Sequence, residues 1–236
     1  MLKTEGIVIM PAQTPSEHFD KVLARLFEVV ILGKTHLKIG RGIADALAAD
    51  RVIAQVCQVF WGTTINAHLD AAQMAAFKLF DSRHGSMSIE YLLGVASQCS
   101  NSFQKATPQR VERITQTSRE KIGKQLTALE ALNSKRNRIL AHMEPTIVSD
   151  PQRLAQKTRV TFKDLEAIFK TAGEILNELS VAYRDTTSLL ELLDDEDFTM
   201  AIQLIADAKH EQADRYEREF GTPAPFGRPA RPRSFS

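Results

Sequence analysis

The stretch Arg136-Asn137-Arg138-Ile139-Leu140-Ala141-His142 closes a long run of helix-forming sequence. The run opens at Thr107-Pro108, where a hydroxyl can cap the first turn and proline suits the first helical position. Apolar side chains then recur at helical spacing as far as Leu132, and only Gly123 weakens the middle. No strong breaker precedes Pro145, so we predict one helix of ~50 Å, with this stretch as its last two turns.

Helical patterns also fill the N-terminal part of the chain. Ser16 can cap a helix, and we expect that helix to break at Gly33, Gly40 and Gly42. Residues 52–80 are rich in Ala, Val, Phe and Leu and are apolar on almost every side. A helix of that kind is buried by other helices or by a second subunit.

The remaining helical patterns follow recognisable start signals. Ser88 can cap a short apolar helix, and Thr161 with Asp164 resembles a capping box in which Asp replaces the usual Glu. An inner stripe then continues to Tyr183. We find no strand alternation and no internal repeat. The fold is therefore predicted to be all-α, a mostly antiparallel helical bundle with long helices.

Changes in composition divide the chain into four parts. We expect an N-terminal arm over residues 1–15 and a helical bundle over residues 16–185. An acidic helical extension is expected over 186–220, and the Pro- and Arg-containing tail 221–236 is predicted to be disordered.

The charge is balanced overall but unevenly distributed. A formal net charge of +1 gives no global field that would point to nucleic acid or to a membrane. Residues 101–142, however, carry nine Lys and Arg against three Asp and Glu, and residues 185–220 carry three against eleven. The basic segment could meet phosphate or the acidic segment, although solvated helix faces account for most such charges.

Several classes of protein and site are disfavoured. No signal peptide and no apolar run near the ~20 residues of a membrane span is present, so we expect a cytoplasmic protein that does not contact membranes. Cys57 and Cys99 have no metal spacing and are expected to be reduced core residues. Gly33-Lys34-Thr35 lacks the first glycine and the strand of a phosphate-binding loop.

We expect no metal and no cofactor. The four residues considered for a metal are His68, Asp70, Asp81 and His84, and their spacing matches no standard site.

The stretch 136–142 resembles the signature of HEPN-domain proteins. That signature is an Arg, four to six residues and a His, often with Asn or Asp after the Arg. Here five residues separate Arg136 from His142, and Asn137 fills the polar position. Within the superfamily the chain is similar to the AbiU2-like group associated with abortive phage infection, over roughly residues 16–183. One departure is Glu144, where the group is expected to carry Asp two residues after the His.

The resemblance implies a homodimeric, metal-independent endoribonuclease that acts in phage defence or as a toxin. On one straight helix, Arg136 and His142 lie about 120° apart around the axis and ~9 Å apart along it. A distorted last turn could bring them into one pocket, or two copies could each supply one half of the site. The resemblance implies the second arrangement, because HEPN nucleases pair so that two such motifs face each other.

The chemistry of these groups suits RNA cleavage. RNA carries its own nucleophile, the 2′-OH, so a proton acceptor, a proton donor and a cation suffice. We assign His142 to proton transfer, Arg136 to the phosphate, and Asn137 to the phosphate or to orienting His142. Arg138 and Lys135 are candidate substrate-binding residues.

Two other interpretations remain. Cations are common at helix C-termini, so the stretch could be an ordinary helix end whose Arg136 pairs with Glu144 or Glu166. The chain could also be a non-catalytic HEPN-like module that binds RNA or a partner protein through the acidic 185–220 region and its apolar faces. In either case, an antitoxin or other regulatory protein could be a partner.

Overall fold

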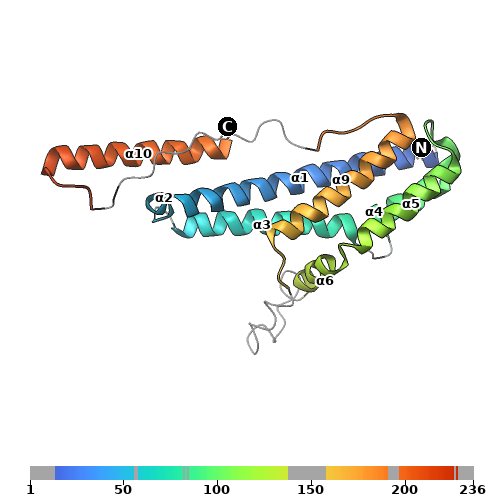
Figure 1. Ribbon diagram of the computed structural model, residues 1–236, viewed down its shortest axis with the longest axis horizontal. Helices are drawn as coiled ribbons and strands as arrows, with labels where there is room; N and C mark the ends of the chain where they lie inside the picture. Colours follow the sequence, from blue (N-terminus) through green and yellow to red (C-terminus); the bar gives the residue numbers. More distant parts are fainter. Residues whose placement is uncertain are drawn as a thin grey trace, which may run out of the picture.

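The computed structural model describes residues 14–55, 58–81, 83, 85–137, 158–190, 197–225 and 227. All regular elements in these ranges are helices (Figure 1). They are α1 (Pro15–Ala49), α2 (Arg51–Gln55), α3 (Gln58–Phe80), α4 (Ile89–Gln98), the 3₁₀ turn η1 (Ser100–Ser102), α5 (Pro108–Gly123), α6 (Leu126–Lys135), α9 (Phe162–Arg184) and α10 (Asp197–Phe220). The prediction of an all-α helical bundle is confirmed.

The bundle is built around the long helix α1. α1 and α3 run side by side in opposite directions, and α4, α5 and α9 complete the bundle at the end where α1 begins (Figure 1). The core that these helices share contains large side chains with almost no exposed surface, including Phe19, Leu93, Ile114 and Phe169. Burial of these apolar stripes is the main force that holds the helices together.

α1 continues through its glycines, so the breaks predicted at Gly33, Gly40 and Gly42 are wrong. At Gly33 the reason is close packing: a Cβ there would lie 2.3 Å from Cζ of Phe169 and 3.0 Å from Cβ of Ala75. The missing side chain lets α9 and α3 approach the backbone of α1.

The start signals are confirmed with one correction. Ser88 caps α4, and Thr107 caps α5. Thr161 and Asp164 form the predicted capping box of α9. The cap of α1, however, is Thr14 rather than Ser16, because Thr14 precedes Pro15 and forms a capping box with Glu17. The Ser16 hydroxyl instead lies 2.6 Å from that of Tyr183.

The predicted single helix from residue 108 onward is wrong as well. α5 ends at Gly123, and α6 begins at Leu126 after a tight turn in which Gln125 N–H donates to the carbonyl of Ile122 over 2.9 Å. Glycine in a helix costs about 1 kcal/mol relative to alanine, so the turn forms where the helix is weakest. α6 then leaves the line of α5 and packs against α3, with Leu132 buried (Figure 1).

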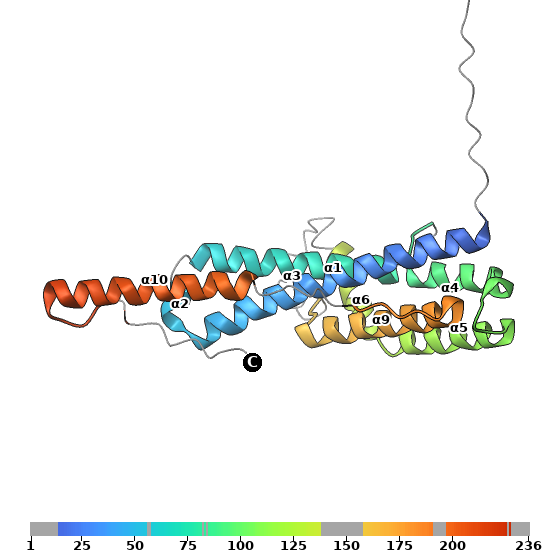
Figure 2. The ribbon, with the colours of Figure 1, turned by 90° about the horizontal axis from the view of Figure 1, so that it is seen from above.

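α10 packs at the other end of the molecule. Its Ala206 joins Ile43, Ile53 and Trp61 in a second, smaller apolar cluster. Figure 2 shows α10 beside α2 and the start of α3, away from α4 and α5. None of the helices that the structure describes is long and apolar enough to span a membrane.

Candidate functional site

The last turn of α6 presents three neighbouring side chains to α3. Leu132, Lys135 and Arg136 stand at positions i, i+3 and i+4, so they lie on one face of the helix. Leu132 is buried in the core. The Lys135 ammonium lies 3.4 Å from the carboxylate of Asp70, and the Arg136 guanidinium carbon lies 4.8 Å from the centre of the Phe77 ring. Packing against α3 therefore fixes where the chain presents Arg136.

A short relay of amides orients the Arg136 side chain. Its Nη1 donates to Oδ1 of Asn137 over 2.8 Å, and Nδ2 of Asn137 donates to Oδ1 of Asn133 over 3.1 Å. In the part of the chain that the structure describes, no carboxylate forms an ion pair with Arg136. No described residue accepts a hydrogen bond from Nε or Nη2, so within this part of the chain the guanidinium keeps donors for an anion.

The predicted site residues are placed only in part. The structure puts Lys135, Arg136 and Asn137 together at the end of α6, with Lys135 22% exposed and held by Asp70. Arg138 and His142 lie outside the described residues, as does Glu144. Glu166, which we considered as a partner for Arg136, instead pairs with Arg41.

A second arginine lies on the same aromatic ring. The guanidinium carbon of Arg83 is 5.5 Å from the centre of the Phe77 ring. Arg83 follows α3 and binds the buried carboxylate of Asp81 through Nε and Nη2, at 2.6 to 3.0 Å. The Ser86 hydroxyl donates to the same carboxylate over 2.9 Å. Arg83 and Phe77 could not be identified from the sequence, because no local pattern links them to residue 136.

Asp81 is held in its charged form. The hydrogen bonds that Arg83 donates lower the pKa of Asp81 from the usual 3.8 to about 2, although burial opposes the shift. This carboxylate therefore stays ionised at any physiological pH, and the turn after α3 keeps its shape.

Replacing Asp81 with asparagine is expected to lower the free energy of unfolding at pH 7 by about 1 kcal/mol, because Arg83 is largely exposed and solvent screens the pair. Asp81 has a depressed pKa in the folded state, so its contribution is present above about pH 4 and is lost as the pH falls toward 2. Urea unfolding of both proteins from pH 7 to pH 2 should show the two stabilities converging. A constant difference over that range would contradict the assignment.

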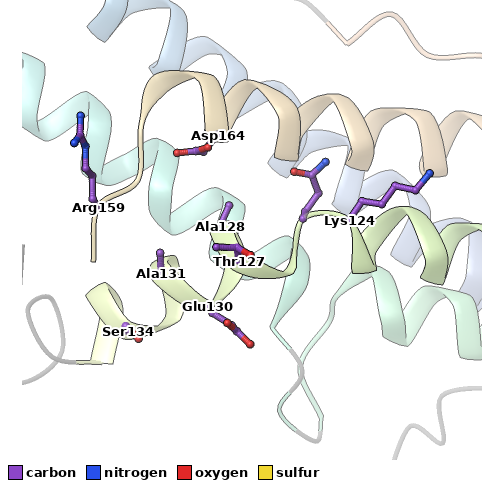
Figure 3. Close-up of a pocket in the computed structure, with 9 residues that line it drawn as sticks. Lys124, Thr127, Ala128, Glu130, Ala131, Ser134, Arg159 and Asp164 are labelled. Carbon is purple, nitrogen blue, oxygen red and sulfur yellow. The ribbon is translucent and has the colours of Figure 1, made fainter. Parts of the chain in front are cut away.

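A separate hollow lies on the opposite face of α6. Its lining comes from the α5–α6 turn, α6 and the start of α9 (Figure 3). Lys124 and Arg159 contribute positive charge, while Glu130 and Asp164 contribute negative charge. Asp164 belongs to the capping box of α9, where hydrogen bonds from Thr161 lower its pKa. Because its charges balance, this hollow has no preference for an anion, and we do not place the site there.

The residues considered for a metal take other contacts. The Nδ1 atoms of His36 and His68 lie 2.9 Å apart between α1 and α3, and burial, with the nearby His36, lowers the pKa of His68. Asp70 pairs with Lys135, and His84 lies outside the described residues. Within the described ranges, no group of three or more His, Cys, Asp or Glu side chains could hold a metal ion.

Of the two cysteines, only Cys99 is described. It is a buried free thiol that donates to the Ala96 carbonyl, and burial raises the pKa of this thiol. Cys57 lies outside the described residues.

Comparison with protein families settles the relationship. The family model HEPN_AbiU2, described as AbiU2, matches residues 46–209, more than two thirds of the chain. The chain belongs to the HEPN_AbiU2 family. The matched range begins later than the similarity noted in the sequence, and it extends into α10. Comparison with curated proteins and with solved structures gives no significant match.

Proposed function

We propose that this HEPN_AbiU2 protein is a metal-independent endoribonuclease whose active site is completed at a homodimer interface. The observation that carries the proposal is the position and hydrogen bonding of the Arg136 guanidinium. Its guanidinium stands at the end of α6, is oriented by Phe77 and Asn137, and retains donors for a phosphate. Membership in the HEPN_AbiU2 family supports the proposal, because the matched range includes residues 136–142, the stretch that resembles the HEPN signature.

The proposed mechanism uses few groups. Arg136 binds the scissile phosphate and stabilises the charge that builds up on it in the transition state. His142 takes the proton of the 2′-OH as this oxygen bonds to phosphorus, and the 5′-oxygen that leaves takes a proton from the imidazolium or from solvent. An imidazole suits this role because its unperturbed pKa lies near neutral pH. Asn137 keeps the guanidinium in place. Arg138 supplies a second phosphate contact, and Lys135 adds positive charge at the rim, reduced by Asp70.

The dimer is proposed because the resemblance to HEPN nucleases implies it: there, two such motifs face each other. On a regular α-helix Arg136 and His142 would point about 120° apart. Residues 136 and 137 have π-helical geometry instead, so the choice of a site shared by two copies rests on the resemblance. Two copies related by a two-fold axis can each contribute one of the groups to each of two sites. Such an enzyme would cleave RNA in phage defence or as a toxin, under the restraint of an antitoxin or another regulatory protein.

The test is cleavage of a single-stranded RNA in excess EDTA. We expect the RNA to be cut and a DNA of the same sequence to remain intact, because DNA lacks the 2′-OH nucleophile. An RNA with one 2′-deoxy position at the main cleavage site should resist cutting at that position alone. No cleavage of any RNA, or equal cleavage of DNA, would contradict the proposal.

A second candidate function is a non-catalytic interaction module. The observation that favours it is the apolar start of α3, where Val59 is 85% exposed and Phe60 is 58% exposed. Met200 and Leu204 of the acidic helix α10 are also exposed. Co-purification of a stoichiometric protein partner, without RNA turnover by the clean protein, would favour this function over the first.

A further inference from the structure

Two guanidinium groups from distant parts of the chain meet on one aromatic ring. Phe77 of α3 is only 9% exposed, so its ring is fixed by packing. Arg136 at the end of α6 lies 4.8 Å from the ring centre, and Arg83 after α3 lies 5.5 Å from it. The guanidinium carbons can therefore be no farther apart than the sum of these two distances.

Each arginine is oriented by a polar partner that leaves part of it open. Arg83 gives its Nε and Nη2 edge to Asp81, and Arg136 gives Nη1 to Asn137. A guanidinium has five N–H donors, so the contacts made with described residues leave both groups donors for a further acceptor. The Arg83 side chain is 59% exposed, so an acceptor can reach it from solvent.

We propose that Arg83 is a second phosphate-binding residue, that it acts with Arg136 on the RNA backbone, and that Phe77 is the positioning residue that holds both guanidiniums. The inference rests on the proposed function and deepens it, because it names the groups that hold the sugar–phosphate chain beside the reacting phosphate.

The local charge fits such a ligand. Arg83, Arg136 and Asp81 together carry a net charge of +1, which matches the single negative charge of a phosphodiester. Lys135 lies beside them, and its ion pair with Asp70 reduces its contribution to this charge. Planar guanidiniums form bidentate hydrogen bonds to phosphate, and stacking on an aromatic ring lowers the entropy lost on binding. A protein that only needed to close the turn after α3 would not require the second arginine on the ring.

The first test measures binding of a single-stranded 2′-O-methyl oligoribonucleotide, which cannot be cleaved through its 2′ position. We expect Arg83→Gln to weaken binding at 0.1 M salt by about 5- to 20-fold and to reduce the slope of log Kd against log salt by about 0.7, the value for one lost contact to a single strand. Asp81→Asn removes the carboxylate that pairs with Arg83 but leaves the positive charge of Arg83 in place. The slope of log Kd against log salt should therefore stay at the wild-type value. If Arg83 served only to hold the turn after α3, Arg83→Gln and Asp81→Asn would change the Kd and the slope alike, and the proposal would be overturned.

The second test addresses Phe77. Phe77→Leu should weaken binding and lower RNA cleavage by about 5- to 20-fold, and Phe77→Tyr should restore both, because it restores the aromatic face. Phe103→Leu is the matched control. Phe103 is 6% exposed and packs against Phe19 and Tyr183, so it reports the effect of the same truncation in the core alone. Equal losses in Phe77→Leu and Phe103→Leu at equal stability would overturn the positioning role.

The possible outcomes distinguish a failure of the role proposed for Arg83 from a failure of the proposed nuclease function. An unchanged Kd and slope in Arg83→Gln, with RNA cleavage that still depends on Arg136, would overturn the role of Arg83 and leave the nuclease standing. Unchanged binding and cleavage in Arg136→Ala would overturn both. Weaker RNA binding by both Arg83→Gln and Arg136→Ala supports the two-arginine site, provided that a thermal unfolding transition shows each variant to be folded.

Discussion

Replacing His142 with alanine is expected to lower the rate of RNA cleavage in EDTA by about 10²- to 10⁴-fold, the usual contribution of a positioned general acid or base. The Michaelis constant should change little, because Arg136 and its neighbours carry most of the contact to phosphate. The loss should be in kcat, and the pH dependence that His142 gives to the rate should disappear with it. Initial rates on one labelled RNA, measured from pH 5 to pH 9, check all three points.

His18→Ala provides the control for this variant. His18 pairs with Tyr91 near the start of α1, far along the chain from α6, and its removal should leave the rate unchanged. Equal activity of wild type and His142→Ala would remove His142 from the mechanism. Loss of activity together with a lower melting temperature would call for the more conservative His142→Gln before any conclusion.

Gly33→Ala is expected to cause the largest loss of stability among the substitutions considered. Two ring atoms of Phe169 lie 2.3 and 2.4 Å from the position of the new Cβ, and that ring is buried in the core. Overpacking of a tight core commonly costs about 1–3 kcal/mol, which exceeds the ~1 kcal/mol gained by replacing glycine with alanine in a helix. Both contacts are shorter than 3.0 Å, which places this site at the upper end of that cost. We therefore expect a net loss of about 2 kcal/mol, or a fall of roughly 4–8 °C in Tm.

Gly94→Ala is the matched control, because Gly94 also lies inside a helix and nothing lies within 4 Å of an added Cβ there. The same substitution should therefore stabilise the protein slightly at position 94 and destabilise it at position 33. Thermal unfolding of both variants under one condition makes the comparison. If Gly33→Ala were as stable as Gly94→Ala, the close contact between α1 and Phe169 would be wrong.

Local signals in the sequence were sufficient for the starts of α4, α5 and α9, while the cap of α1 lies at Thr14 rather than at the predicted Ser16. A capping hydroxyl at Thr107 before Pro108, and the pair Thr161 and Asp164, act within one turn, so the structure confirms them. The glycines of α1 were misread for the opposite reason. A glycine that ends a helix and one that admits a neighbouring helix look alike in sequence, and only the position of Phe169 distinguishes them for Gly33.

The residues of the candidate site also divide into those that a local sequence pattern reveals and those that only the fold brings together. The spacing of Arg136, Asn137 and His142 is a local pattern, so it could be noticed without a structure, and the fold joins Arg136 to Asn137 by a hydrogen bond at the end of α6. Phe77 and Arg83 could not be found that way. Their link to Arg136 depends on the turn after Gly123, which redirects α6 onto α3.

The central claim, an RNase site completed by two copies of the chain, is tested most directly by mixing two inactive variants. Arg136→Ala and His142→Ala are purified separately, confirmed as dimers near twice 26.4 kDa by light scattering, then mixed and allowed to exchange subunits. A heterodimer would then contain one site with Arg136 from one subunit and His142 from the other. Random exchange should restore about one quarter of wild-type activity, because half of the dimers are mixed and each has one complete site. Activity that stays at the level of the separate variants after complete exchange would contradict the shared site.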